Sequence, residues 1–280
     1  MKVYIGTDME GVNGVVTREH THRDGREHDR ARAWLTEEVN AAVDGVLAAG
    51  ATVVVVEDGH GTCRNILPDQ LHPRASLITG QVTTLPPSMV HGLDGSYDAV
   101  LLIGYHARAG TPNANLDHTS WSQTVRHVRV DRQEVGETSI MSAYAGAHGV
   151  PVVCVSGDDA LGRELDELQP DIEQAIVKKA LGRFVCEMLP IEEGRTLIRE
   201  KARLGVERRG EIPPFRFAHP ATLELEFLHP LYADLAAMVP TCERTGPEKV
   251  AVTSSDYLTL FNTFTVMCAT SAIALQANAR

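Results

Sequence analysis

The sequence lacks paired cysteines, long hydrophobic runs and an excess of basic residues. Its five cysteines are widely spaced and include no Cys-X-X-Cys pair, which argues against a zinc ribbon or a disulfide framework and favours a reducing compartment. Lys and Arg number 26 against 37 Asp and Glu, so the formal net charge is −11, and the basic residues are interspersed with acids. Because phosphate binding needs a clustered basic surface, a nucleic-acid partner is disfavoured.

Export and membrane segments are not expected either. The opening residues MKVYIG lack the long apolar stretch of a signal peptide and run directly into a strand-like pattern. No stretch reaches the roughly 18 uncharged apolar residues that span a bilayer. The most apolar candidate helix, residues 257–276, is interrupted by Thr, Asn and Ser. We therefore expect a cytoplasmic protein with no membrane partner.

Several catalytic motifs are missing as well. No GxGxxG follows the first predicted strand, and the sequence contains no GxxxxGK[ST], no GxSxG and no HExxH. The motifs therefore do not support dinucleotide binding or P-loop phosphate binding. They also do not support a hydrolase with a nucleophile elbow or a protease with the common zinc-binding helix.

What is present is the pattern of a large α/β protein. Apolar residues make up 43% of the 280 residues and charged residues 22%, which are ordinary values for a globular chain with a sizeable core. Apolar runs predict strands at 2–7, 51–61, 75–80, 97–106 and 150–159, and helical periodicity predicts helices at 29–50 and 137–149. This alternation predicts a parallel or mixed central sheet with flanking helices.

The pattern changes after about residue 185. A charged helix at 190–209 is followed by strands at 222–229 and 250–255 and by helices at 229–239 and 256–276, and a hairpin is expected earlier, at 124–137. We therefore expect a first α/β domain over residues 1–185 and a smaller α+β second lobe over residues 186–280.

Acidic and histidine side chains follow four of the predicted strands. The segments after these strands contain Asp8 and Glu10, the EDGH of 57–60, His106, and the acids 158 and 159. Turns alone would explain any one of these residues, and a lone histidine is more often structural than a ligand. Ligands nevertheless collect at the carboxyl ends of parallel strands, and carboxylates with imidazoles suit zinc. The joint occurrence at several strand ends favours a metal site.

The motifs TDMEGVNG (7–14), EDGHG (57–61), GYHARAGTP (104–112), VGE (135–137) and VSGDD (156–159) together resemble the D-aminopeptidase family of metallopeptidases, peptidase family M55. The resemblance runs in order over residues 1 to about 185 and continues more faintly beyond them. It implies two zinc ions per subunit and a catalytic histidine in the loop after GYHA, which falls on His118. The implied zinc ligands are Asp8, Glu10, His60, His106 and Glu137. The family also implies a ring-shaped decamer with active sites facing an inner chamber.

The chemistry of these residues agrees with that resemblance but leaves roles open. Two zinc ions would lower the pKa of a shared water and polarise a scissile carbonyl, with Asp8 best placed to bridge both ions. His118 could transfer a proton, stabilise an oxyanion or attack as a nucleophile. For substrate binding, Arg108 could pair with a carboxylate, although a structural ion pair is as good a reading. Asp158, with Asp159 and Asp117, could hold an α-amine.

The leading hypothesis is a zinc-dependent aminopeptidase that hydrolyses short peptides through a dinuclear, metal-activated water. The family resemblance favours peptides with N-terminal D-amino acids, such as D-Ala-D-Ala dipeptides. The alternative is a dinuclear metallohydrolase acting on another amide or on a phosphoester, because the same metal pair serves phosphatases. A non-catalytic, metal-dependent binding protein is disfavoured because every expected ligand and His118 are present.

Overall fold

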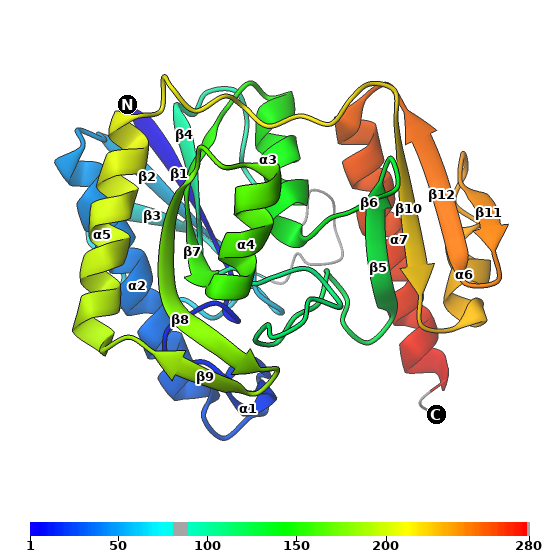
Figure 1. The fold of residues 1–280 in the computed structure, drawn as a ribbon, viewed down its shortest axis with the longest axis horizontal. Helices are drawn as coiled ribbons and strands as arrows, with labels where there is room; N and C mark the ends of the chain where they lie inside the picture. The colour runs from blue at the N-terminus through cyan, green and yellow to red at the C-terminus, as the bar shows by residue number, and fades with distance from the viewer. Residues whose placement is uncertain (81–88, 279–280) are drawn as a thin grey trace.

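A computed structural model describes residues 1–80 and 89–278, and its larger sheet places the N-terminal strand near the middle (Figure 1). The strand order is β3-β2-β1-β4-β7-β8-β9, and all neighbours are parallel except the β8–β9 pair. The strands span Lys2–Thr7 (β1), Val53–Asp58 (β2), Ala75–Ile78 (β3), Ala99–Ile103 (β4), Val152–Asp158 (β7), Glu173–Gly182 (β8) and Val185–Met188 (β9). The predicted mixed, mostly parallel sheet is confirmed.

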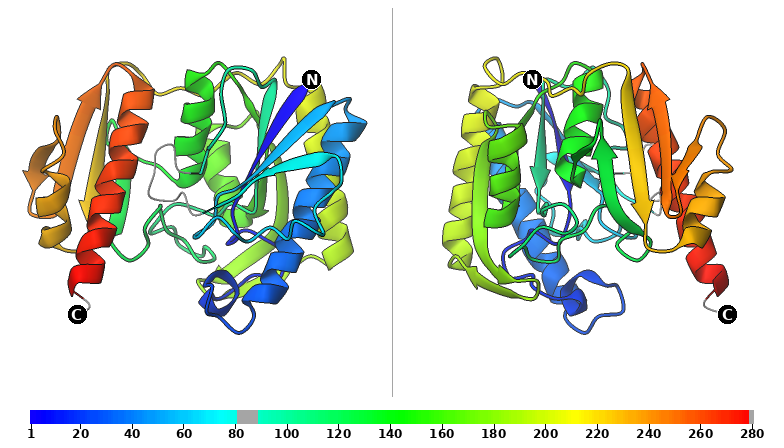
Figure 2. Two further views of the ribbon diagram at one scale, coloured as in Figure 1. Left: turned by 180° about the vertical axis from the view of Figure 1, so that it is seen from behind. Right: turned by 45° about the vertical axis from the view of Figure 1, so that its right-hand side comes forward.

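Helices cover both faces of this sheet, which explains the continuous apolar runs of its inner strands. Helices α2 and α5 pack against each other on one face, while α3 and α4 lie on the other (Figures 1 and 2). Their bounds are His28–Ala48 (α2), Glu137–Ala147 (α3), Asp159–Leu168 (α4) and Ile191–Glu207 (α5), and a short helix, α1, spans Arg18–Thr21.

A second, antiparallel sheet has the strand order β11-β12-β10-β5-β6. Its strands span Val125–Val130 (β5), Gln133–Glu134 (β6), Ala221–Phe227 (β10), Glu243–Gly246 (β11) and Lys249–Ser254 (β12). Helices α6 (Pro230–Ala236) and α7 (Tyr257–Asn278) pack on it, and α7 also contacts α3 of the first layer (Figure 2). The Tyr257 hydroxyl donates a hydrogen bond of 3.0 Å to the Ile140 carbonyl and ties these helices together.

The two sheets interleave along the chain. The hairpin predicted at 124–137 forms β5 and β6 of the second sheet, although it precedes strands β7 to β9 of the first. Helix α5, beyond residue 185, packs on β7 and β8 of the first sheet. The domain boundary between residues 185 and 186 stays a prediction. Grouping by sheet would instead place the hairpin β5–β6 with the second lobe and helix α5 with the first domain.

Helix α7 is more apolar than we expected from the polar residues that interrupt its sequence. Its residues Tyr257–Gln276 have a mean hydropathy of 1.6 and are, by length and composition alone, apolar enough to cross a membrane. Half of this window is buried against the rest of the fold, and core helices commonly have such a composition.

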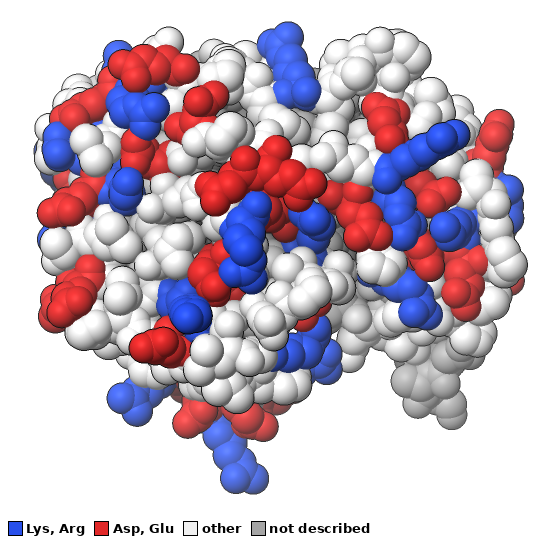
Figure 3. All heavy atoms as spheres, viewed as in Figure 1, with Lys and Arg blue, Asp and Glu red and all other residues white. Residues whose placement is uncertain are grey.

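On the face of the molecule in Figure 3, acidic and basic side chains are intermingled, as the sequence indicates.

Candidate metal centre

Three neighbouring strands bring the predicted ligands to one edge of the larger sheet. Strand β1 lies between β2 and β4, and Thr7 is in register with both Asp58 and Ile103. The residues that follow these strand ends therefore leave the sheet side by side, as parallel strands require. Asp8 follows β1, His60 follows β2 and His106 follows β4.

A close backbone approach holds the segment after β1 over the end of β4. The Gly11 amide donates to the Gly104 carbonyl at 2.7 Å, and the Asp8 amide donates to the Ile103 carbonyl at 2.8 Å. A Cβ atom at Gly11 would lie 1.9 Å from the Tyr105 carbonyl oxygen, so only glycine fits there. This contact turns the chain so that the Glu10 side chain stays beside Asp8.

The Asp8 carboxylate lies between two histidine–glutamate pairs. Its Oδ1 is 2.9 Å from His60 Nδ1, which is 3.0 Å from Glu10 Oε2. Its Oδ2 is 3.3 Å from His106 Nε2, which is 3.4 Å from Glu137 Oε1. Asp8, Glu10, His106 and Glu137 are buried, and His60 is nearly so. One carboxylate therefore faces two half-sites, each with one imidazole and one further carboxylate.

Backbone carbonyls fix the far nitrogen of each histidine ring at this edge. A nitrogen that faces a carbonyl must carry the hydrogen, so the other nitrogen presents its lone pair to the site. These contacts are His60 Nε2 to Thr21 O at 2.9 Å, His106 Nδ1 to Ala107 O at 3.0 Å and His118 Nδ1 to Leu116 O at 2.8 Å. The rings are thus oriented as metal ligands are.

Several buried atoms of the cluster have no hydrogen-bond partner within residues 1–80 and 89–278. They are Asp8 Oδ2, Glu10 Oε2 and His106 Nε2. Buried polar atoms are almost always paired, and carboxylates this close together repel one another. Asp8, Glu10 and His106 offer ligand atoms that all lie within 4.8 Å of one another, as do His106, His118 and Glu137. The residues therefore fit a divalent metal such as zinc.

The carboxylates and imidazoles shift one another's protonation. Burial by itself would lower the pKa of His60 and of His106, but the facing carboxylates outweigh it, so both pKa values lie well above the ordinary histidine value. Burial would likewise raise the pKa of Asp8, but its close contacts with His106 and His60 outweigh that effect and hold the pKa well below its ordinary value. In the metal-free protein, protons on the histidines take the place of cations.

Zinc is expected to stabilise the protein more at about pH 8 than at about pH 6. Zinc has to replace the protons on His60 and His106, and this is easier at higher pH. In the metal-free protein, the raised pKa values of these histidines contribute stability that is fully present below about pH 6.5 and is lost as pH rises through the folded-state values. The lowered pKa of Asp8 contributes stability present above about pH 4 and lost as pH falls. Thermal melts of chelator-treated protein with and without zinc measure the gain, and an equal or larger gain at the lower pH would contradict the prediction.

His118 lies at the open side of the cluster. Its ring stacks on the His106 ring with centroids 4.1 Å apart and planes 11° apart, and its Nε2 is 3.7 Å from Glu137 Oε1. The loop that carries it is braced by Asp117 Oδ2, which accepts from the Gly110 amide at 2.7 Å. The side chain is partly exposed, so a substrate can reach it.

The candidate substrate-binding residues have protein partners. The Arg108 guanidinium lies 3.8 Å from Glu164 and 3.5 Å from Glu167. Asp158 is buried, and its Oδ1 caps α4 by accepting from the Leu161 amide at 2.9 Å. Asp117 pairs with Arg183, and Asp159 accepts from the Ala180 amide at 2.7 Å and pairs with Arg163. A substrate role for Arg108 and Asp158 stays a prediction.

Some supporting residues had no motif to mark them. The buried carboxylate of Glu164 accepts from the Arg108 amide at 2.9 Å and from the Gly136 amide at 3.1 Å. These amides neighbour His106 and Glu137, so Glu164 braces two ligand-bearing segments. The Ser120 amide donates to Glu137 Oε1 at 2.6 Å and links the His118 loop to α3.

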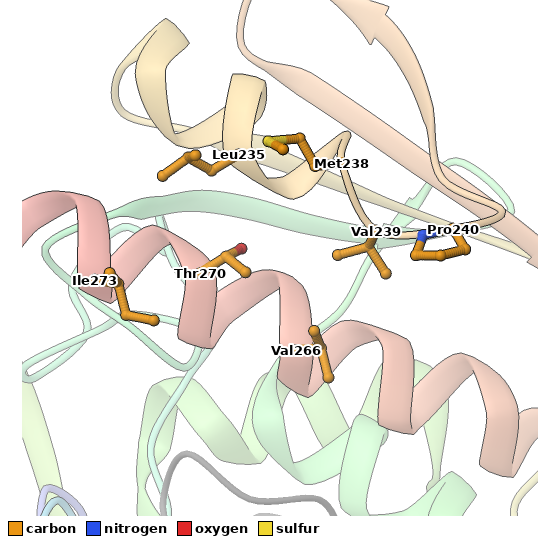
Figure 4. A pocket seen from close by; sticks show the side chains of 7 residues that line it. All are labelled: Leu235, Met238, Val239, Pro240, Val266, Thr270 and Ile273. Atoms are coloured by element: carbon orange, nitrogen blue, oxygen red, sulfur yellow. The ribbon is translucent and has the colours of Figure 1, made fainter.

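A small, mostly apolar pocket opens beside Glu137. Its lining comprises Met89, Ser120, Trp121, Glu137, Met141, Phe261, Phe264, Thr265 and Cys268. Its volume of about 10 Å³ is close to that of one water molecule. A larger apolar groove of about 460 Å³ lies away from the cluster, between α6 and α7 (Figure 4). Of these two, the pocket beside Glu137 is the one that a predicted metal ligand lines.

Comparisons with known proteins identify the family of this chain. Residues 1–266 match the peptidase family M55, described as D-aminopeptidase. The chain is 35% identical over 269 residues to the D-aminopeptidase of Bacillus subtilis (strain 168), covering 95% of this chain and 96% of that protein. A solved structure described as the Zn-dependent D-aminopeptidase DppA from Bacillus subtilis, a self-compartmentalizing protease, superposes with a TM-score of 0.92 and 32% identity, covering 97% of this chain and 98% of that one. The chain therefore belongs to the D-aminopeptidase family, peptidase family M55.

Proposed function

We propose that this protein is a zinc-dependent D-aminopeptidase that removes N-terminal D-amino acids from short peptides. The observation that carries the proposal is the position of Asp8 between the two histidine–glutamate pairs at one sheet edge. Relatives named as a D-aminopeptidase and as a Zn-dependent D-aminopeptidase support both the activity and the metal.

We assign two zinc ions to this cluster. Glu10 and His60 would hold one ion, His106 and Glu137 the other, and Asp8 would bridge them. Bound zinc would supply a water of lowered pKa and polarise the scissile carbonyl. The buried surroundings exclude bulk water and strengthen these electrostatic effects.

His118 is proposed to move the proton. Its Nδ1 donates to the Leu116 carbonyl, so Nε2 is the nitrogen that faces Glu137 and the open side of the cluster. From there it can take a proton from the attacking water and give it to the leaving amine. Its stacking on His106 fixes the ring without making it an obligatory ligand.

The pocket beside Glu137 is proposed to receive the side chain of the cleaved residue. Its small volume and apolar walls suit a short aliphatic side chain such as that of D-alanine. Arg108 stays the candidate for the carboxylate of a dipeptide, and Asp158 a candidate for its amine. Because Asp158 is buried and caps α4, it would have to lose that contact to bind substrate directly.

We further infer that the protein forms a homo-oligomer, with the ring-shaped decamer as the expected form. A relative is described as a self-compartmentalizing protease. The groove between α6 and α7 exposes large apolar side chains, with Met238 77% and Ile273 65% exposed, and such surfaces often mark interfaces (Figure 4). Analytical ultracentrifugation of the full chain measures the number of subunits in the assembly.

A cytoplasmic location stays a prediction.

The purified protein is expected to hydrolyse D-Ala-D-Ala faster than L-Ala-L-Ala and to release no phosphate from p-nitrophenyl phosphate. Removing zinc with EDTA should reduce peptide hydrolysis to background, and added zinc should restore it, because carboxylate and imidazole ligands compete with the chelator for the ions. Amino-acid and phosphate release over one panel measure this. Full peptidase activity in metal-free protein would contradict the metal role, and phosphoester hydrolysis alone would favour the alternative hydrolase.

A further inference from the structure

Lys178 is a fully buried ammonium that none of the roles above uses. It lies on β8 with 2% of its surface exposed, and its described hydrogen bonds are all to neutral oxygens. Nζ lies within hydrogen-bond distance of four oxygens that share its three hydrogens: Glu10 O at 2.6 Å, Val12 O at 3.1 Å, Val15 O at 2.6 Å and Asn115 Oδ1 at 2.9 Å. A buried charge is costly unless its surroundings compensate for it, so this arrangement calls for a role.

The carbonyls around Lys178 belong to the turn that carries Glu10. Within this turn the Val12 amide bonds to Met9 O at 3.2 Å and the Val15 amide to Val12 O at 3.1 Å, so the chain curls and several carbonyls point inward. Converging carbonyl oxygens repel one another, and an ammonium with three hydrogens neutralises that repulsion. From helix α2, the buried Glu38 Oε1 accepts from the Asn13 amide of the same turn at 2.9 Å.

The fourth oxygen connects the same ammonium to the loop that carries His118. Asn115 Oδ1 accepts from Lys178, while the Asn115 amide donates to Asp158 Oδ2 at 2.9 Å. Its Nδ2 donates to Val16 O at 3.1 Å, which returns to the end of the Glu10 turn. Lys178 therefore connects the turn that carries Glu10 to the loop that carries His118.

We propose that Lys178 is a positioning residue for the metal centre: it holds the turn 10–15 in place, so that Glu10 completes the half-site it shares with Asp8 and His60. This inference rests on the metal role proposed for Glu10. Preorganised ligands bind a metal more tightly because the ordering cost is met during folding. Among the described residues Lys178 makes no direct contact with His106 or Glu137 and is linked to them through Asn115 and the His118 loop, so the larger effect is expected on the half-site of Glu10.

Zinc titration of Lys178→Met against a competing chelator tests this asymmetry. In the wild type we expect two binding steps. In the variant one step should weaken by about 10–100-fold, the size typical of lost supporting contacts, while the other should change less than about 3-fold. The matched control is Lys179→Met, which removes the exposed lysine next along β8 and should match the wild type.

The outcomes separate a positioning role from a merely structural one. If Lys178→Met lowers the melting temperature but leaves both zinc steps unchanged, or weakens both equally, Lys178 supports only the fold and the inference is wrong. If the wild type itself binds no zinc, the proposed function fails first. If the wild type binds two ions and the variant matches it, only the inference about Lys178 fails.

A second measurement does not depend on the variant folding. Hydrogen exchange of residues 9–16 in the full-length wild type is compared with and without zinc. Because Lys178 already holds this turn, we expect its amides to stay protected when zinc is removed with a chelator. Rapid exchange of 9–16 in the metal-free protein would mean that the metal orders the turn, which would overturn the proposal.

Discussion

Replacing Asp8 with asparagine is expected to abolish most peptidase activity and to release bound zinc. Asp8 Oδ1 and Oδ2 face His60 and His106 separately, so this one side chain serves both half-sites. Asparagine keeps the shape but loses the negative charge, and it points an NH₂ group at one of the two sites. We expect kcat/KM to fall by roughly 10³–10⁴-fold, because residues that act as one catalytic unit fail together.

Zinc content by mass spectrometry and kcat/KM on D-Ala-D-Ala measure the effect of Asp8→Asn. Asp69→Asn is the matched control, since the Asp69 side chain is exposed in the segment between β2 and β3. The control should keep wild-type zinc content and turnover. An Asp8→Asn variant that retains two zinc ions and near-normal turnover would show that Asp8 does not bridge them.

Replacing His118 with asparagine is expected to lower kcat by about 10²–10⁴-fold while leaving zinc content unchanged. His118 stacks on His106, and its Nε2 is 3.7 Å from Glu137 Oε1. This distance is longer than those between the predicted zinc ligands themselves, so His118 lies beside the ligands. Removing the ring deletes the proton carrier but leaves both half-sites intact. KM should change little, because the loss falls on the chemical step.

His22→Asn provides the control for that substitution, because His22 is exposed beyond α1. It should match the wild type in kcat, KM and zinc content. Loss of zinc together with turnover in His118→Asn would make His118 a metal ligand. Unchanged turnover would remove its catalytic assignment.

Part of the candidate site was predictable from a general rule, whereas Glu137 and His118 were expected only from the family resemblance. Parallel strands bring their carboxyl ends together, so acids and histidines after the strands ending at Thr7, Asp58 and Ile103 had to meet once those strands were neighbours. The expectation that Asp8 is best placed to bridge both ions assumed a central first strand, and the structure places β1 between β2 and β4. Strand order depends on packing of the whole sheet rather than on local pattern.

Supporting contacts were hidden from the sequence for a different reason. The carbonyl of Thr21 that orients His60 is a backbone atom, and any residue supplies one. Lys178 sits in β8, a strand whose mixed pattern gave no prediction, because a buried lysine looks like an exposed position in a periodicity argument. Glu164 is likewise a polar residue on an amphipathic helix, and only the tertiary fold turns it inward.

The long-range arrangement of the second sheet was equally inaccessible. The hairpin β5–β6 was expected from alternation at 124–137, but its pairing with β10, some ninety residues later, follows from no local signal. For α7, the polar interruptions do not keep the helix out of the core, because hydroxyls can bond to the helix's own carbonyls, as Thr265 does to Phe261 O at 3.1 Å.

Anomalous diffraction at the zinc absorption edge would show directly whether Asp8 bridges two zinc ions. Two zinc peaks per subunit are expected, about 3.5–4 Å apart, with Asp8 between them. Glu10 and His60 should contact one peak, and His106 and Glu137 the other. A single peak, or two peaks that do not share Asp8, would contradict the dinuclear centre on which the proposed function rests.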